Sequence, residues 1–296
     1  MGILEESYEE GSNLERTVAI GDAGTFAIEG IPAMGAGGLP DISIDWGKYG
    51  GVSIRAASIR GRLHRYEGTP RQDAYSMAFA ESDSFFHSVV AIADGVGSLP
   101  MSHVAAEVSV CAAAGETKRQ ILSSGLDFVD WKQVFESAVN SLYNKTGIPS
   151  EKVTNMACTL LVAVLRTSPA SPSTYADCRI AGIGDSSAWK LDRQQWKNIT
   201  PPKCADGFVS DASVDAIPLC SMDKLAITET SLQKGESLFL FTDGVSDPMG
   251  DGDSLLGQCL ADAFSAAPSP YRFAHVLDFA RRSHSDDRTA VGLWIC

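Results

Sequence analysis

The chain has 296 residues, of which 44% are hydrophobic and 21% charged, so it can bury a substantial core and lies near the upper size of a single domain. Its formal net charge of -13 opposes nucleic acid or an anionic membrane as a partner, whereas carboxylates are the ligands that hard divalent cations need. Seven scattered cysteines without a CxxC pair indicate a reduced protein with buried thiols, not a disulfide framework.

We expect one main domain over residues 51–296, preceded by an N-terminal extension of unclear role over residues 1–50. The extension opens with acidic residues and lacks a secretory signal pattern, and no run in the chain is long and apolar enough to span a bilayer. Together with the reduced cysteines, these features favour a cytoplasmic protein.

From residue 52 onward, the hydrophobic pattern predicts groups of strands and pairs of helices. Strands are expected at 52–61, 74–80, 85–93, 157–165, 177–183, 187–191, 237–242 and 289–295. Helices are expected at 102–122, 130–147, 254–266 and 271–283, the second of them capped by Asp130. This grouping, without strict alternation of strand and helix, favours an α+β fold with antiparallel sheets.

Aspartate recurs at the edges of the apolar strands. The residues are Asp73, Asp94, Asp185, Asp243 and Asp287. Each alone is explained by the preference of aspartate and glycine for turns that end strands. If the strand ends meet at one edge of packed sheets, however, the carboxylates repel one another unless cations lie between them. Oxygen ligands without a zinc-type His or Cys spacing indicate Mg²⁺ or Mn²⁺.

Six motifs in order resemble those of the metal-dependent protein phosphatases (PPM, type 2C), especially the compact bacterial forms. They are RQDAY (71–75), ADGVG (93–97), ACTLLVAVL (157–165), GIGDSSAW (182–189), FTDGVSD (241–247) and SDDRTAVGLWI (285–295). The resemblance implies an α+β sandwich of two packed antiparallel β-sheets flanked by helices on both sides, with a binuclear metal centre at one end. It covers roughly residues 52 to 296 and is specific because the motifs occur together.

The resemblance also implies a role for each acidic position. Asp94 resembles the carboxylate that bridges two cations, and the carbonyl of Gly95 resembles a ligand of one of them. Asp243 and Asp287, the latter preferred over Asp286, resemble the remaining direct ligands. Two further acids complete the set: Asp73 would act mainly through water, and Asp185 would hold a third cation together with Asp243.

The activity implied by the resemblance is hydrolysis of phosphoserine and phosphothreonine in proteins by a metal-activated water, with two Mn²⁺ or Mg²⁺ ions per site. No side-chain nucleophile is needed, and the chain has no Cys-x5-Arg loop or G-x-S-x-G motif. The expected partner is a phosphoprotein substrate in signalling, with a serine/threonine kinase acting in opposition.

The residues that would bind the substrate phosphate depart from the family pattern. Many members carry Glu-Asp in the first motif and an arginine five residues before that Asp, whereas this chain has Gln72-Asp73 and Gly68. We expect His64 and Arg65 to contact the phosphate, with Arg62 and Arg71 as further candidates. The alternative is that these basic side chains are simply exposed to solvent at a strand end and bind no phosphate. Ser187 replaces a common arginine, and Arg288 follows Asp287 where asparagine is usual.

Two other functions remain open at this point. A phosphatase-like regulatory module with weak catalysis, binding a phosphoprotein or kinase, would explain the missing arginine. Hydrolysis of a small phosphorylated metabolite by the same cations is also chemically allowed. Metal titration separates the module from the enzyme, and a substrate panel separates the two hydrolytic activities.

Overall fold

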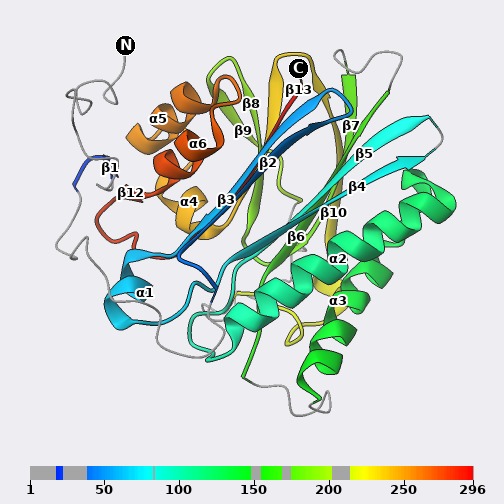
Figure 1. Ribbon diagram of the computed structural model, residues 1–296, viewed down its shortest axis with the longest axis horizontal. Coiled ribbons are helices and arrows are strands. Elements are labelled where there is room, and N and C mark those ends of the chain that lie inside the picture. Colours follow the sequence, from blue (N-terminus) through cyan, green and yellow to red (C-terminus); the bar gives the residue numbers. More distant parts are fainter. Residues whose placement is uncertain are drawn as a thin grey trace.

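A computed structural model of the chain describes residues 18–22, 39–82, 84–147, 155–168, 175–201 and 214–295. Two antiparallel β-sheets pack face to face, and helices cover the outer face of each sheet (Figure 1). This four-layer α+β arrangement confirms the expected fold class. It also places the two sheets so that several strand ends meet at one end of the sandwich, where the short helices α1 (Arg62–Glu67) and α4 (Asp243–Met249) lie.

The first sheet has five strands in the order β10-β7-β6-β5-β4, all antiparallel. Its strands are β4 (Ala74–Ser82), β5 (Phe85–Ala93), β6 (Leu160–Thr167), β7 (Tyr175–Ile183) and β10 (Ala226–Gln233). β5 and β6 are buried over almost their whole length, as expected for central strands built from Val, Ile, Leu and Ala.

The second sheet has six strands in the order β2-β3-β13-β11-β8-β9, again all antiparallel. Its strands are β2 (Ile42–Tyr49), β3 (Val52–Ile59), β8 (Ser187–Asp192), β9 (Gln195–Asn198), β11 (Glu236–Phe241) and β13 (Arg288–Ile295). The fully buried β13 lies in the middle of this sheet, between β3 and β11.

Two pairs of helices cover the sheets (Figure 1). The long α2 (Ser102–Ser124) and α3 (Trp131–Thr146) pack on the five-stranded sheet, and α5 (Leu255–Phe264) and α6 (Pro270–Leu277) pack on the six-stranded sheet. Asp130 caps α3 as expected, because its carboxylate accepts the backbone N–H of Gln133. No helix in the described part of the chain is long and apolar enough to cross a membrane.

Short elements complete the chain. They are α1 (Arg62–Glu67), α4 (Asp243–Met249), the 3₁₀ turns Leu126–Phe128 and Met222–Lys224, and the parallel pair β1 (Val18–Ala19) and β12 (Phe279–Ala280). Three hydrophobic clusters lie between the layers, one between the two sheets and one under each helix pair. Because both faces of each sheet are covered, close packing on both sides holds the strand ends in place.

Three sequence expectations are corrected by this structure. The helix expected over 271–283 ends at Leu277, and the chain then forms the short strand β12. β10 is not among the expected strands; its residues are mostly half-buried or exposed because it is an edge strand. β2 belongs to the six-stranded sheet, so that sheet begins at Ile42, inside the expected extension; residues 1–17 and 23–38 of the extension lie outside the described residues.

Candidate metal centre

A cavity of about 430 Å³ opens where strand ends from both sheets meet. β5 and β7 run in the same direction in the first sheet, and in the second sheet the end of β11 lies beside the start of β13. Residues directly before or after these four strands therefore share one edge of the sandwich. The cavity is lined by Asp94, Gly95, Val96, Gly97, Ser98, Thr159, Asp185, Val214, Ala216, Leu219, Asp243 and Asp286.

Asp94 and Gly95 follow β5 and are held by the neighbouring backbone. The N–H of Asp94 donates to the hydroxyl of Thr159 at 3.0 Å, and the N–H of Thr159 donates to the carbonyl of Asp94 at 2.8 Å. A Cβ on Gly95 would lie 2.8 Å from the carbonyl oxygen of Gln72, so only glycine fits at this position. The backbone at the predicted ligand pair is thereby fixed from both sides.

The carboxylates around the cavity raise one another's pKa values. Burial, followed by the charges of Asp73 and Asp243, raises the pKa of Asp94 well above its usual value. Burial and the charge of Asp286 raise the pKa of Asp243 to about 6, although a hydrogen bond with Asp94 lowers it. The carboxylates at this edge are thus brought together without enough positive charge to neutralise them.

The donor set fits divalent cations. Asp243 Oδ1 is buried and has no hydrogen-bond partner, as expected for an atom whose partner is an ion. Among the described residues that line the cavity there is no Lys, Arg or His, so protons or bound cations must offset the negative charge. All ligating groups are oxygens, which Mg²⁺ and Mn²⁺ prefer.

Asp73 lies behind this wall and does not line the cavity. Its side chain is almost completely buried, and its Oδ2 accepts the hydroxyl of Thr242 at 2.7 Å. Burial and the charge of Asp287 raise the pKa of Asp73 well above its usual value. Thr242, which the sequence analysis did not single out, orients the Asp73 carboxylate behind the cavity wall.

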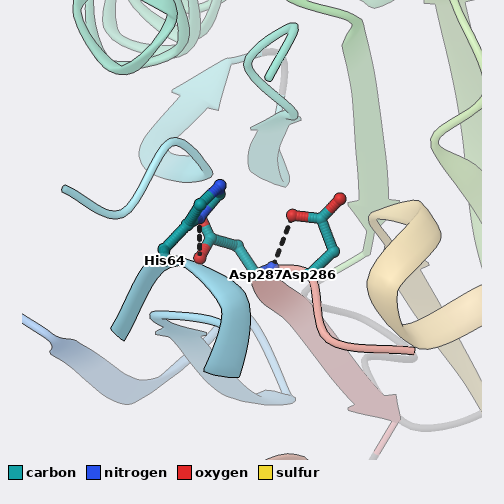
Figure 2. A group of neighbouring side chains, drawn as sticks. All are labelled: His64, Asp286 and Asp287. Carbon is teal, nitrogen blue, oxygen red and sulfur yellow. Dashed lines mark hydrogen bonds and ion pairs between the residues drawn. The ribbon is translucent and has the colours of Figure 1, made fainter. Parts of the chain in front are cut away.

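The structure places Asp286 at the cavity instead of Asp287, which was the preferred ligand. Asp286 is exposed and lines the cavity, whereas Asp287 is buried and does not. The Asp287 carboxylate accepts the backbone N–H groups of Gly61 and Gln72 and pairs with His64 Nδ1 at 2.8 Å (Figure 2). The preference for Asp287 as a direct metal ligand is therefore corrected, because its oxygens are already occupied by the protein.

His64 and Arg65, the expected phosphate contacts, do not line the cavity. Burial lowers the pKa of His64, yet the hydrogen bond and charge of Asp287 outweigh it and raise that pKa overall. The same bond holds the pKa of Asp287 below its usual value, against the effect of burial. Potential ligand atoms of His64, Asp286 and Asp287 lie within 4.8 Å of one another, but the first and third of these residues already bind each other.

The three arginine candidates lie outside the cavity wall, and two of them contact other parts of the fold. Arg65 contacts Asp278 at 3.4 Å, and the buried Arg71 donates to the hydroxyl of Ser58 and the carbonyl of Asp73. Arg62 is buried on α1 and is absent from the cavity wall. Thus the structure gives no described basic side chain a place in the wall of the acidic cavity.

The loop that carries Asp286 is positioned by residues that the sequence alone did not single out for this role. Arg288 is fully buried and donates to the carbonyls of His284 at 2.7 Å and Asp286 at 3.2 Å, with its guanidinium 4.4 Å from the ring centre of Phe279. Gly244 packs so closely that a Cβ would lie 1.9 Å from the carbonyl oxygen of Asp287. The departure from asparagine at position 288 was the only sequence signal of this support.

Fold and site together define a metal-dependent phosphatase of the two-sheet sandwich class. A model of the protein phosphatase 2C family matches residues 60–281, and the chain belongs to that family. It is accordingly a phosphoprotein phosphatase. A comparison with curated proteins gives no match.

Solved structures share the fold at low sequence identity. The catalytic domain of the serine/threonine protein phosphatase PstP, in complex with two manganese ions, is 19% identical, with a TM-score of 0.58 over 82% of this chain and 97% of that chain. The Mycobacterium tuberculosis serine/threonine phosphatase PstP/Ppp is 17% identical, with a TM-score of 0.56 over 82% of this chain and 98% of that chain. The S. agalactiae serine/threonine phosphatase is 12% identical, with a TM-score of 0.53 over 83% and 100%.

Proposed function

We propose that this protein hydrolyses phosphoserine and phosphothreonine in proteins, using two Mn²⁺ or Mg²⁺ ions bound at the acidic cavity. The observation that carries the proposal is the meeting of Asp94, Asp185, Asp243 and Asp286 around one cavity. The similar PstP structure contains two manganese ions, which supports this choice of metal. We expect the protein to act in the cytoplasm on a phosphoprotein substrate, in opposition to a serine/threonine kinase.

The proposed ligands combine the family resemblance with the residues that line the cavity. Asp94 would serve both ions, the carbonyl of Gly95 would bind one of them, and Asp243 and Asp286 would bind the other. Asp73 would act through water from its buried position, and Asp185 with Asp243 would hold a third ion more weakly. Asp287 then serves the centre indirectly, because its hydrogen bonds fix the backbone of the first motif.

The bound ions would supply a water of lowered pKa as the nucleophile and would offset charge on the phosphoryl oxygens. The protein's own residues hold the carboxylates in place: Thr159 fixes the backbone at Asp94, and Thr242 orients Asp73. None of the described cysteines lines the cavity, and burial raises the pKa values of Cys158 and Cys178 to about 12, so neither of these thiols is suited to act as a nucleophile.

The test is replacement of the proposed ligands one at a time. Asp94→Asn, Asp243→Asn and Asp286→Asn should each abolish release of phosphate from a phosphopeptide and weaken Mn²⁺ binding in calorimetry, while circular dichroism stays unchanged. The exposed Asp251→Asn is the matched control and should behave as wild type. Full activity of all three ligand variants would refute the proposal.

The regulatory module is the second candidate, favoured by the lack of a basic residue among the described cavity-lining residues. It would bind a phosphoprotein or kinase with little turnover. Calorimetry separates the two functions: paired Mn²⁺ binding with turnover supports the enzyme, and phosphopeptide binding without metal or turnover supports the module. A panel that includes small phosphorylated metabolites tests the third possibility, a metabolite phosphatase.

A further inference from the structure

The cavity has an apolar part beside its acidic part. We call Val96, Val214, Ala216 and Leu219 the apolar rim. Val214 is 47% exposed and Leu219 is 56% exposed, which places both among the exposed large hydrophobic residues of the described chain. Single exposed apolar residues are common, but two of them in the wall of a cavity that also carries Asp94, Asp185, Asp243 and Asp286 suit a ligand that covers them.

The apolar rim is held at a fixed position relative to the acidic cluster. Ile217 is fully buried, and its backbone exchanges two hydrogen bonds with Cys158, at 2.9 and 3.0 Å. Cys158 directly precedes Thr159, whose side chain and backbone bind Asp94. The N–H of Leu219 donates to the carbonyl of Ala216 at 2.9 Å, which closes the turn that presents Leu219.

Size and charge limit what can occupy this space. A volume of about 430 Å³ lies within the range of ligand pockets and exceeds the needs of a single phosphate group. The net charge of -13 disfavours acidic residues beside the phosphate. An apolar side chain next to the phosphorylated residue would cover Val214 and Leu219 and remove their surface from water.

We propose that the apolar rim selects phosphoprotein substrates with an apolar side chain flanking the phosphoserine or phosphothreonine. This rests on the proposed function, because the same ligand must also reach Asp94 and Asp243. The rim binds the flanking side chain, and the acidic cluster with its ions binds the phosphate. A specificity of this kind needs no basic residue in the cavity wall.

The experiment uses the full chain with Mn²⁺ and pairs of phosphopeptides that differ by one leucine-to-serine change, moved through the three positions on each side of the phosphoserine. Wild type should show kcat/KM about tenfold higher for leucine at one position, mainly through KM, as expected for one apolar side chain in a pocket. Leu219→Ser and Val214→Ser should reduce this preference to less than twofold.

Two controls separate this effect from damage to the enzyme. Ile227→Ser changes an apolar residue of similar exposure, 47%, that lies on β10 outside the cavity wall, and it should retain the tenfold preference. N-acetylphosphoserine amide has no flanking side chain, so its kcat/KM measures any change in a variant that does not involve that side chain, and each leucine preference is compared with it. Its hydrolysis tests the proposed function by itself.

Several results would overturn the inference while leaving the proposed function intact. One is turnover of the peptides without preference for leucine at any position, and another is a preference that Leu219→Ser leaves unchanged. A wild-type dimer in sedimentation that Leu219→Ser converts to monomers would show that a second copy covers the rim. If no ester is hydrolysed, calorimetric binding of the same peptide pairs decides: tighter binding of the leucine peptide supports the inference, and equal binding overturns it.

Discussion

Asp286 and Asp287 are neighbours in the chain but have opposite surroundings. Asp286 is exposed at the cavity and accepts the N–H of Asp287 at 2.8 Å, whereas Asp287 is buried among backbone N–H groups and His64 (Figure 2). A buried carboxylate with several donors has a structural role, because its charge is already compensated. An exposed carboxylate facing other carboxylates is suited to bind a cation.

Replacing each aspartate by asparagine should therefore give different results. Asp286→Asn should weaken Mn²⁺ binding with little change in the free energy of unfolding of the metal-free protein. Asp287→Asn should lower that free energy by about 2 to 4 kcal/mol, because an amide cannot accept all the hydrogen bonds that the carboxylate accepts. Calorimetry and urea denaturation measure the two effects; an equal loss of stability in both variants would contradict the assignment.

Arg288 supports the site through the backbone of the loop before it. Arg288→Met removes the hydrogen bonds to the carbonyls of His284 and Asp286, so Mn²⁺ affinity should fall by roughly tenfold or more. Arg288→Lys should recover part of the affinity, since an ammonium can still donate to one carbonyl. The exposed Arg282→Met is the matched control. Unchanged affinity of folded Arg288→Met in calorimetry would show that the loop holds its shape without Arg288.

At the scale of elements, the start of α4 packs directly against the segment before β13. Gly244 makes this contact possible, because a Cβ there would lie 1.9 Å from the carbonyl oxygen of Asp287. Asp243 is the first residue of the same helix, so any shift of α4 moves a proposed ligand. Asp243 and Asp286 are thus both positioned by the contact between Gly244 in α4 and Asp287 just before β13.

Gly244→Ala should lower the free energy of unfolding by roughly 1 to 3 kcal/mol and weaken Mn²⁺ binding, because the added methyl group pushes α4 away. Gly115→Ala is the matched control: it lies in α2 with nothing within 4 Å of the added Cβ, and alanine should stabilise that helix by about 0.5 to 1 kcal/mol. Thermal denaturation and calorimetry report both quantities. Wild-type metal affinity in Gly244→Ala would refute the positional argument.

For the whole molecule, the acidic cluster makes metal-free stability depend on pH. Asp243 has a folded pKa of about 6 against a usual value of 3.8, so the folded state binds a proton more tightly than the unfolded state. The stability that the raised pKa of Asp243 contributes is therefore fully present below pH 3.8 and is lost as the pH rises through 6. Without metal, the free energy of unfolding should fall by roughly 1 to 3 kcal/mol between pH 5 and pH 7.

Mn²⁺ should reverse this trend, since the ions bind deprotonated carboxylates. At 100 times the dissociation constant, the metal adds about 2.7 kcal/mol at pH 7, which raises Tm by roughly 5 to 10 °C. Urea and thermal denaturation in EDTA and in Mn²⁺ across this pH range provide the measurement. Asp243→Asn should flatten the metal-free profile, and an unchanged profile in that variant would assign the pH dependence to other groups.

The sequence alone determined most of the element order and the place of the acids at the strand ends. Hydrophobic periodicity is local, so the long strands and α2, α3 and α5 were predictable, whereas the edge strand β10 and the end of α6 depended on neighbours. Only the tertiary structure decided that Asp286 faces the cavity and that His64 pairs with Asp287. The two aspartates lie in the loop before β13, and the close contacts that Gly61 and Gly244 make with the backbone of this loop hold its conformation.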